Sequence, residues 1–152
     1  LATAAGIEDG VILRDLQAMG FTAATVALLP LAPLVQVAWA EGQVSAGERE
    51  LILEAGAARG IAPGTPGYEQ LLEWLTRRPS EAFLEGALRA CQSMINALPE
   101  TERHARRQAL LAACTGVAQA SRGAMGLGRR ISDEEQRLLD RIAALLERAA
   151  PQ

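Results

Sequence analysis

The residues with the clearest potential for chemistry are two glutamates that flank a short, glycine-containing segment. Glu41 and Glu48 stand seven positions apart. Carboxylates held around a turn offer oxygen ligands to a hard divalent cation such as Ca²⁺ or Mg²⁺. A calcium site needs about six to eight oxygens, so Gln43, Ser45, backbone carbonyls or water would have to complete the shell. The segment also lacks the alternating Asp series of a calcium-binding loop. The competing interpretation is therefore that Glu48 caps a helix and that Glu41 is a solvated helix end.

Two serine–glutamate pairs predict helix starts. Ser45 stands three positions before Glu48, and Ser132 stands three positions before Glu135. In such a capping box, each side chain accepts a hydrogen bond from the backbone N–H of the other residue. Acids in a first helical turn, such as Glu135 and the two acids before it, are also favoured by the helix dipole. The sequence thus leaves two hypotheses for Glu48 and Glu135, which are either metal ligands together with Glu41 or helix caps alone.

The remaining reactive residue types do not combine into a catalytic site. His104 is the single histidine and has no Ser, Cys or metal-ligand partner at a motif spacing, so we expect an exposed helix residue. Cys91 and Cys114 lack CxxC spacing and fall on apolar stripes, as buried, unreactive thiols of a cytoplasmic protein would. The protein is therefore predicted to be cytoplasmic and not to be an enzyme. A carboxylate- or metal-dependent enzyme centred on Glu41 is the alternative.

Glycine and arginine clusters also have two interpretations each. The Gly-rich stretch 122–130 precedes a helix, and such a loop can hold phosphate through backbone N–H groups. No strand precedes it and its spacing matches no phosphate-binding fingerprint, which favours a flexible hairpin loop. Arg103, Arg106 and Arg107 lie near the start of their helix, where we expect a solvated basic face.

The composition favours a single all-α domain over residues 1–152. Hydrophobic residues make up 49% of the chain and are mostly Ala and Leu, which favour helices, whereas aromatic residues make up only 3%. No segment shows the period-2 alternation of a strand. The net charge of −3, with every basic residue an Arg, is unlike that of a nucleic-acid-binding domain. We therefore predict no nucleic-acid partner and no cofactor other than a divalent cation.

A charge-free segment of twenty residues, 21–40, is long enough to span a bilayer. Pro30 and Pro33 interrupt it and Gln36 lies within it, so a buried core segment is favoured over a membrane-associated one. The chain begins at Leu1 without a Met, which leaves open whether a signal or another segment precedes it.

Helical periodicity and stop signals predict the element boundaries. In the helix that follows Ser45, the inward face is predicted to consist of Leu51, Ile52, Ala55 and Ala58. The expected helices cover 7–20, 22–29, 33–41, 45–60, 68–77, 80–98, 99–121 with Pro99 at the first helical position, and a last one from 132 onward.

Two parts of the chain, 37–52 and 117–139, match each other. Each has the pattern Val-Ala-x-Ala, a turn, an aliphatic residue and a capping box that leads into two further aliphatic residues. Two such helical hairpins would pack about a pseudo-twofold axis and bury their leucine stripes together. Chance similarity between two capped, Ala- and Leu-rich helices is the competing explanation.

The segment 37–50, VAWAEGQVSAGERE, resembles the signature of the tellurite-resistance TerB family, and 117–139 resembles the second repeat of that family. The resemblance covers roughly 22–149. It implies a compact bundle of about seven helices with two pseudo-symmetric helical-hairpin repeats. It also implies acidic turn residues that bind a metal cation, and no enzymatic activity defines such proteins.

Residue by residue, the resemblance implies a cation site at Glu41 and Glu48, with Glu135 as the matching acid of the second copy. Glu41 stands where the family usually has Asp. Ser121 replaces the turn acid in the second copy, and the stretch 122–130 is longer than the family's turn, which argues against a symmetric second site. The implied function is a non-enzymatic module of the bacterial stress or tellurite-resistance type. It would act by binding a protein partner, by self-association or by weak binding of a divalent cation.

Overall fold

The computed structural model describes residues 14, 26–123 and 131–147. Within these ranges it contains six α-helices, one 3-10 helix and no strand, which confirms the predicted all-α class. The count of about seven helices stays a prediction, because most of the expected helix at 7–20 lies outside the described residues. In chain order the elements are η2 (Val26–Leu31), α2 (Ala32–Ala38), α3 (Ala46–Ala58), α4 (Pro66–Thr76), α5 (Glu81–Asn96), α6 (Glu100–Gly123) and α7 (Asp133–Glu147).

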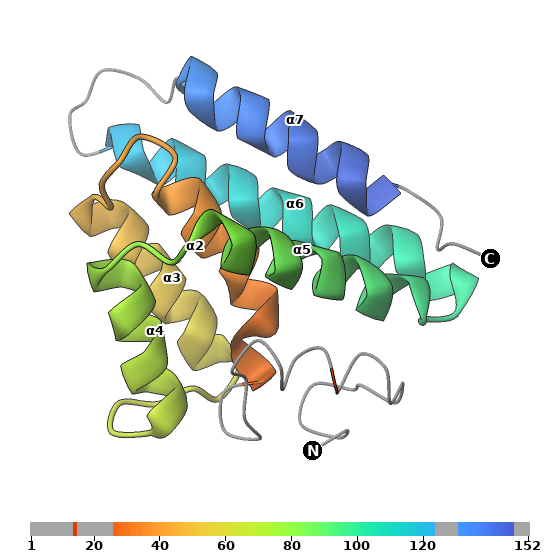
Figure 1. Cartoon of the computed structure of the whole chain (residues 1–152), viewed down its shortest axis with the longest axis horizontal. Helices are drawn as coiled ribbons and strands as arrows, with labels where there is room; N and C mark the ends of the chain where they lie inside the picture. Colours follow the sequence, from red (N-terminus) through yellow and green to blue (C-terminus); the bar gives the residue numbers. More distant parts are fainter. Residues whose placement is uncertain (1–13, 15–25, 124–130, 148–152) are drawn as a thin grey trace.

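The short helix α2 lies in the middle of the bundle (Figure 1). It contacts η2, α3, α5, α6 and α7, and all seven of its residues are buried. A side chain there meets other helices on every side, which explains the lack of charge in this segment, since an unpaired buried charge is costly. Pro30 lies inside η2. Pro33 lies in the first turn of α2, where a backbone N–H has no hydrogen-bond partner within the helix, so the N–H that proline lacks is not needed. The described part of the segment is therefore core, as predicted.

Three longer helices, α5, α6 and α7, extend along the long axis of the molecule (Figure 1). Of these, α6 contacts α2 and α3 as well as the other two long helices, α5 and α7. The apolar stripes predicted for these helices face the core. Their buried hydrophobic members are Leu84, Ala87, Leu88, Cys91, Ile95, Cys114, Val117, Ala118, Leu139, Ile142 and Leu146.

The inward face of α3 differs from the predicted one. Its buried residues are Glu48, Ile52 and Gly56, spaced four apart, whereas Ala58 is exposed and its predicted place on the inward face is wrong. A Cβ atom at Gly56 would lie 3.1 Å from Cδ2 of Leu71, so the missing side chain lets α4 pack closely there. The prediction counted apolar side chains only, and it therefore overlooked a buried glycine and a buried acid.

Several boundaries also shift by one or two residues. Helix α4 begins at Pro66, before the predicted start at residue 68, because Thr65 caps it and proline suits a first helical turn. Helix α6 begins at Glu100, so Pro99 precedes the helix rather than occupying its first position. The same helix extends to Gly123, into the expected loop at 122–130, and the rest of that loop lies outside the described residues.

Helix α3 ends as predicted at a glycine in the left-handed region. Gly60 has a φ of +85°, and the N–H of Ile61 donates to the carbonyl of Gly56 at 3.0 Å. This pattern is the Schellman motif, which satisfies carbonyls that the helix leaves free. It fixes Arg59, the C-cap residue, at this end of the helix.

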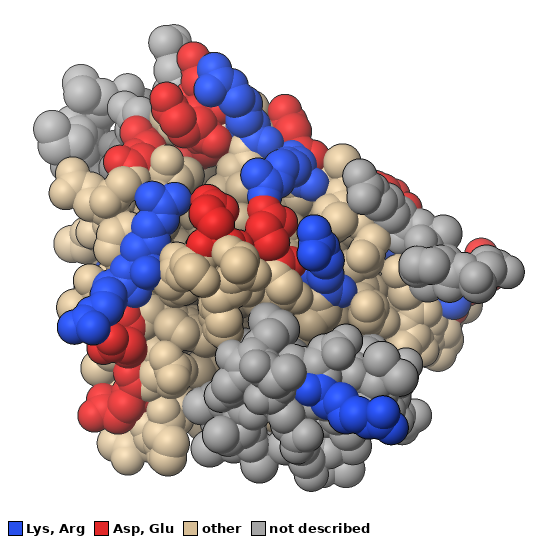
Figure 2. Space-filling model, viewed as in Figure 1, with Lys and Arg blue, Asp and Glu red and all other residues tan. Residues whose placement is uncertain are grey.

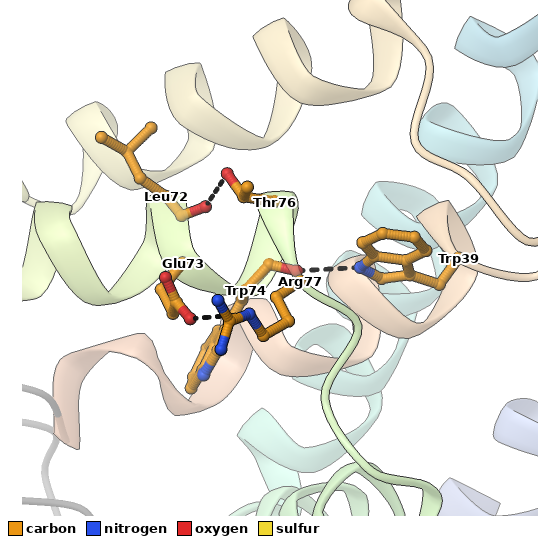
Figure 3. Close-up of polar contacts among 6 residues, drawn as sticks. All are labelled: Trp39, Leu72, Glu73, Trp74, Thr76 and Arg77. Atoms are coloured by element: carbon orange, nitrogen blue, oxygen red, sulfur yellow. Dashed lines mark hydrogen bonds and ion pairs between the residues drawn. The ribbon is translucent and has the colours of Figure 1, made fainter.

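A tryptophan hydrogen bond ties the end of α2 to the end of α4 (Figure 3). Nε1 of Trp39 donates to the carbonyl of Trp74 at 2.8 Å. Trp74 is buried and its ring lies 5.5 Å from that of Phe83, centroid to centroid, while Trp39 is partly buried against the core, so both tryptophans contribute to it. The bond also fixes the chain two residues before Glu41, where the turn toward α3 begins.

The face of the molecule in Figure 2 carries acidic and basic side chains that are interleaved rather than gathered by sign. The ion pairs of the described residues include Arg77 with Glu73, at 3.6 Å, and Arg141 with Glu85. Such exposed pairs contribute about 0–1 kcal/mol each to stability. Within the described ranges, no helix combines the length and apolar character that crossing a membrane requires.

Candidate functional site

Both predicted capping boxes are formed. At the start of α3, the N–H of Ser45 donates to Oε1 of Glu48 at 2.8 Å, and the N–H of Glu48 donates to Oγ of Ser45 at 3.2 Å. At the start of α7, the N–H of Ser132 donates to Oε1 of Glu135 at 2.9 Å, with a return bond of 3.1 Å to Ser132 Oγ. The two glutamates are unusually buried for capping residues, since Glu48 is 3% exposed and Glu135 is 1% exposed.

Glu41 lies on the exposed turn between α2 and α3. The turn follows from local hydrogen bonds, in which Ala40 N–H donates to Val37 O at 3.0 Å and Gly42 N–H donates to Trp39 O at 2.9 Å. Gly42 has a φ of +93°, which an L-residue with a side chain rarely adopts. The turn therefore places Glu41 shortly before the N-terminus of α3.

The three candidate carboxylates interact electrostatically. The pKa of Glu48 is raised from 4.5 to about 7, chiefly because the residue is buried; the negative charges of Glu135 and Glu41 also raise this pKa, while the hydrogen bonds with Ser45 lower it. Near neutral pH, Glu48 is thus present both as an acid and as a carboxylate. Glu41 and Glu135 thus lie near enough to Glu48 for their charges to act on it, although 94 positions separate Glu41 from Glu135.

The first turn of α3 also packs against the end of α6. A Cβ atom at Gly47 would lie 3.0 Å from the carbonyl oxygen of Ala120, so only glycine fits without a shift of one of the helices. This contact places the first turn of α3 beside the end of α6. In the internal repeat, that part of α6 corresponds to the end of α2. The side chain of Ser121, the predicted counterpart of Glu41, lies outside the described residues.

The arrangement offers negative charge to a proton or a cation. In the described ranges, however, no three His, Cys, Asp or Glu side chains are close enough together to hold a metal ion. Each capping glutamate already uses one oxygen on its own helix start. The cation site at Glu41, Glu48 and Glu135 therefore stays a prediction.

The thiols and the histidine lie where the sequence placed them. Cys91 and Cys114 are both buried, and burial raises the pKa of each thiol to about 12. The Sγ atom of Cys91 lies 3.4 Å from the carbonyl oxygen of Leu29, to which it donates. His104 is exposed on α6. These positions confirm the predicted buried thiols and the predicted exposed histidine.

The arginine row of α6 is only partly the solvated face that the sequence predicted. Arg106 is exposed, but Nε of Arg103 donates to the carbonyl of Leu98 at 2.8 Å, and Nε of Arg107 is buried without a hydrogen-bond partner in the described part of the chain. Arg106 also lines an apolar cavity of about 240 Å³ that the sequence did not indicate. Four distant segments form it, so no local pattern could have identified it.

No family model, no curated protein sequence and no solved structure matches this chain.

Proposed function

We propose that the chain is a non-enzymatic, TerB-like module that acts by binding, and that the two capped turns form its binding part. The observation that supports this most directly is the electrostatic interaction between Glu48 and Glu135. They occupy equivalent places in the two matching segments, and both are buried. Chance similarity between two helices would not require their capping acids to interact electrostatically.

The packing of the helices also supports two related hairpins. One hairpin consists of α2, the turn and α3, and the other consists of α6, the longer loop and α7. Helix α2 contacts α7 and α6 contacts α3, as a pseudo-twofold arrangement requires. An axis between the hairpins would place Glu48 and Glu135 on opposite sides of it.

The proposed ligand is a divalent cation that binds weakly. The charges of Glu135 and Glu41 disfavour a negative charge on the buried Glu48, and a cation would relieve that repulsion as a proton on Glu48 does. The available protein oxygens are few, so we expect a Kd on the order of 10⁻⁴–10⁻³ M, as in weak calcium modules. At millimolar cation the native state would gain roughly 1 kcal/mol.

Calorimetry and thermal melting test this proposal. Wild type, Glu41→Ala and the matched control Glu50→Ala, an exposed glutamate on α3, are titrated with Ca²⁺, Mg²⁺, Mn²⁺ and Zn²⁺ up to millimolar concentration. We expect a saturable heat and a rise in Tm in wild type and Glu50→Ala that Glu41→Ala lacks. Without cation, Glu41→Ala should melt close to wild type because Glu41 is exposed.

The same experiment separates the two kinds of binding in the proposal. If no cation produces a heat that Glu41→Ala removes, the cation hypothesis fails and Glu48 and Glu135 are helix caps. The module would then act through a protein partner or a second copy of itself. Sedimentation of the purified chain over a tenfold range of concentration distinguishes self-association from binding of another protein.

A further inference from the structure

An apolar cavity lies at the opposite end of α3 from the capped turn. It has a volume of about 240 Å³, and its walls come from the η2–α2 segment, α3, α5 and α6. The cavity residues Ala55 and Arg59 follow Glu48 by seven and eleven positions, so they lie about 10–16 Å from it along the helix. This distance makes the cavity independent of the proposed cation site.

The wall of the cavity is aliphatic. Leu31 and Leu34 lie on one side, Met94 and Ile95 lie on another, and Leu110 is contributed by α6. At about 30 Å³ per group, which is the share of liquid volume that one water molecule takes, the volume corresponds to roughly eight groups of that size. The cavity therefore fits a single alkyl chain and is too small for a helix.

Among the described residues, the charged residues that line the cavity are two arginines, Arg59 at the end of α3 and Arg106 on α6. Both residues are exposed, so we place their charge at the solvent-facing side of the cavity. The Arg59 charge acts on the Cys91 thiol, one of the wall groups, and opposes the rise in its pKa that burial causes. Positive potential therefore reaches the cavity, in a chain whose net charge is −3.

An apolar cavity with cationic groups at its mouth is complementary to an amphipathic anion. We propose that it binds a medium-chain carboxylate, with the alkyl chain in the cavity and the carboxylate between Arg59 and Arg106. Arginine suits this head group because its planar guanidinium donates two parallel hydrogen bonds to a carboxylate. The alternative role of Arg59 is to compensate the carbonyls at the end of α3, which involves no ligand.

Calorimetry with decanoate below its micelle concentration tests the proposal. We expect saturable binding of decanoate, at least about tenfold weaker binding of decanol, which lacks the charge, and no binding of acetate, which lacks the chain. Arg59→Gln and Arg106→Gln should each weaken decanoate binding by about threefold, and the double variant by about tenfold, as expected for exposed charge pairs. Arg89→Gln, which removes an exposed arginine of α5 outside the cavity, should bind as wild type does.

A second pair of variants locates the ligand. Ala109 is exposed and lines the cavity, whereas Ala105, one turn earlier on α6, is exposed and does not. Ala109→Trp should block the mouth and abolish decanoate binding, while Ala105→Trp should bind normally. Because both residues are exposed, both variants should fold, and circular dichroism checks this.

Three results would overturn the proposal. One is the absence of saturable decanoate binding to folded wild type. Another is binding that survives both the double arginine variant and Ala109→Trp, which would place the ligand elsewhere. The third is a protein that ignores free decanoate but sediments with phosphatidylglycerol–phosphatidylcholine vesicles, since the arginines would then meet a lipid surface.

Discussion

Glu48 combines a structural role with surroundings that disfavour its charge. Its carboxyl group accepts the hydrogen bond that caps α3, which requires an acceptor but not a negative charge. Burial and the neighbouring carboxylates both favour the neutral acid. A capping residue on the surface would experience neither effect, so this glutamate links helix stability to pH.

We expect Glu48→Gln to become more stable relative to wild type as the pH rises. The pKa of Glu48 is about 7 in the folded state and near 4.5 when unfolded, so the stabilisation by its neutral form is complete below pH 4.5 and is lost as the pH rises through 7. Glutamine keeps a capping acceptor and cannot ionise. The free energy of unfolding of the variant, minus that of wild type, should therefore rise by about 1–3 kcal/mol between pH 5 and pH 8.

Urea unfolding at the two pH values measures this difference. Glu50→Gln, at an exposed position of the same helix, is the matched control and should show no such change. If the free energies of unfolding of Glu48→Gln and wild type differ by the same amount at pH 5 and pH 8, Glu48 is charged at both pH values. The proposed repulsion between Glu48 and the neighbouring carboxylates would then lose its basis.

At the scale of the elements, two glycines of the helical regions have opposite roles. Gly47, in the first turn of α3, faces the backbone carbonyl of Ala120, and a Cβ atom there would lie only 3.0 Å from it. Gly116, within α6, has open space beside it, and a Cβ atom would make an ordinary contact of 3.8 Å with Leu51. One glycine is thus required by helix packing, whereas the other only lowers helix propensity.

Gly47→Ala should destabilise the fold by about 1–3 kcal/mol, because a backbone atom cannot move aside as a side chain can. Gly116→Ala should stabilise it by about 0.4–1 kcal/mol through the lower entropy of the unfolded chain. Denaturation midpoints of the two variants and wild type check both signs. If Gly47→Ala were as stable as wild type, α3 and α6 would have to lie further apart than they do here.

The same elements show what the sequence could and could not predict. The capping boxes and the C-terminal glycine of α3 were predicted correctly because their signals lie within a few residues. The inward face of α3 was predicted wrongly at Ala58, since its packing depends on the approach of α4 to Gly56. The cavity depends on distant segments that no local pattern connects, and the electrostatic interaction of Glu48 with Glu135 depends on two segments that only the internal repeat related to each other.

The whole molecule is organised around α2, which has only seven residues. It contacts five other elements, and no residue of it reaches solvent to any large extent. A helix this short is not stable alone in water, so its structure depends on the helices that enclose it. Those helices in turn lose their shared core if α2 unfolds, which predicts that the described elements unfold together.

We therefore expect a single cooperative unfolding transition. Far-ultraviolet circular dichroism reports on all helices, whereas tryptophan fluorescence reports on Trp39 and Trp74, where the ends of α2 and α4 meet. In urea, both signals should change with the same midpoint and the same slope, as two-state unfolding requires. The variant Trp74→Phe, followed by the fluorescence of Trp39 alone, should again show matching midpoints, both at lower urea because a buried ring is reduced in size. If fluorescence changed at clearly lower urea than dichroism, α4 and the tryptophan junction would unfold before the rest, and α2 would not be the element that unites the bundle.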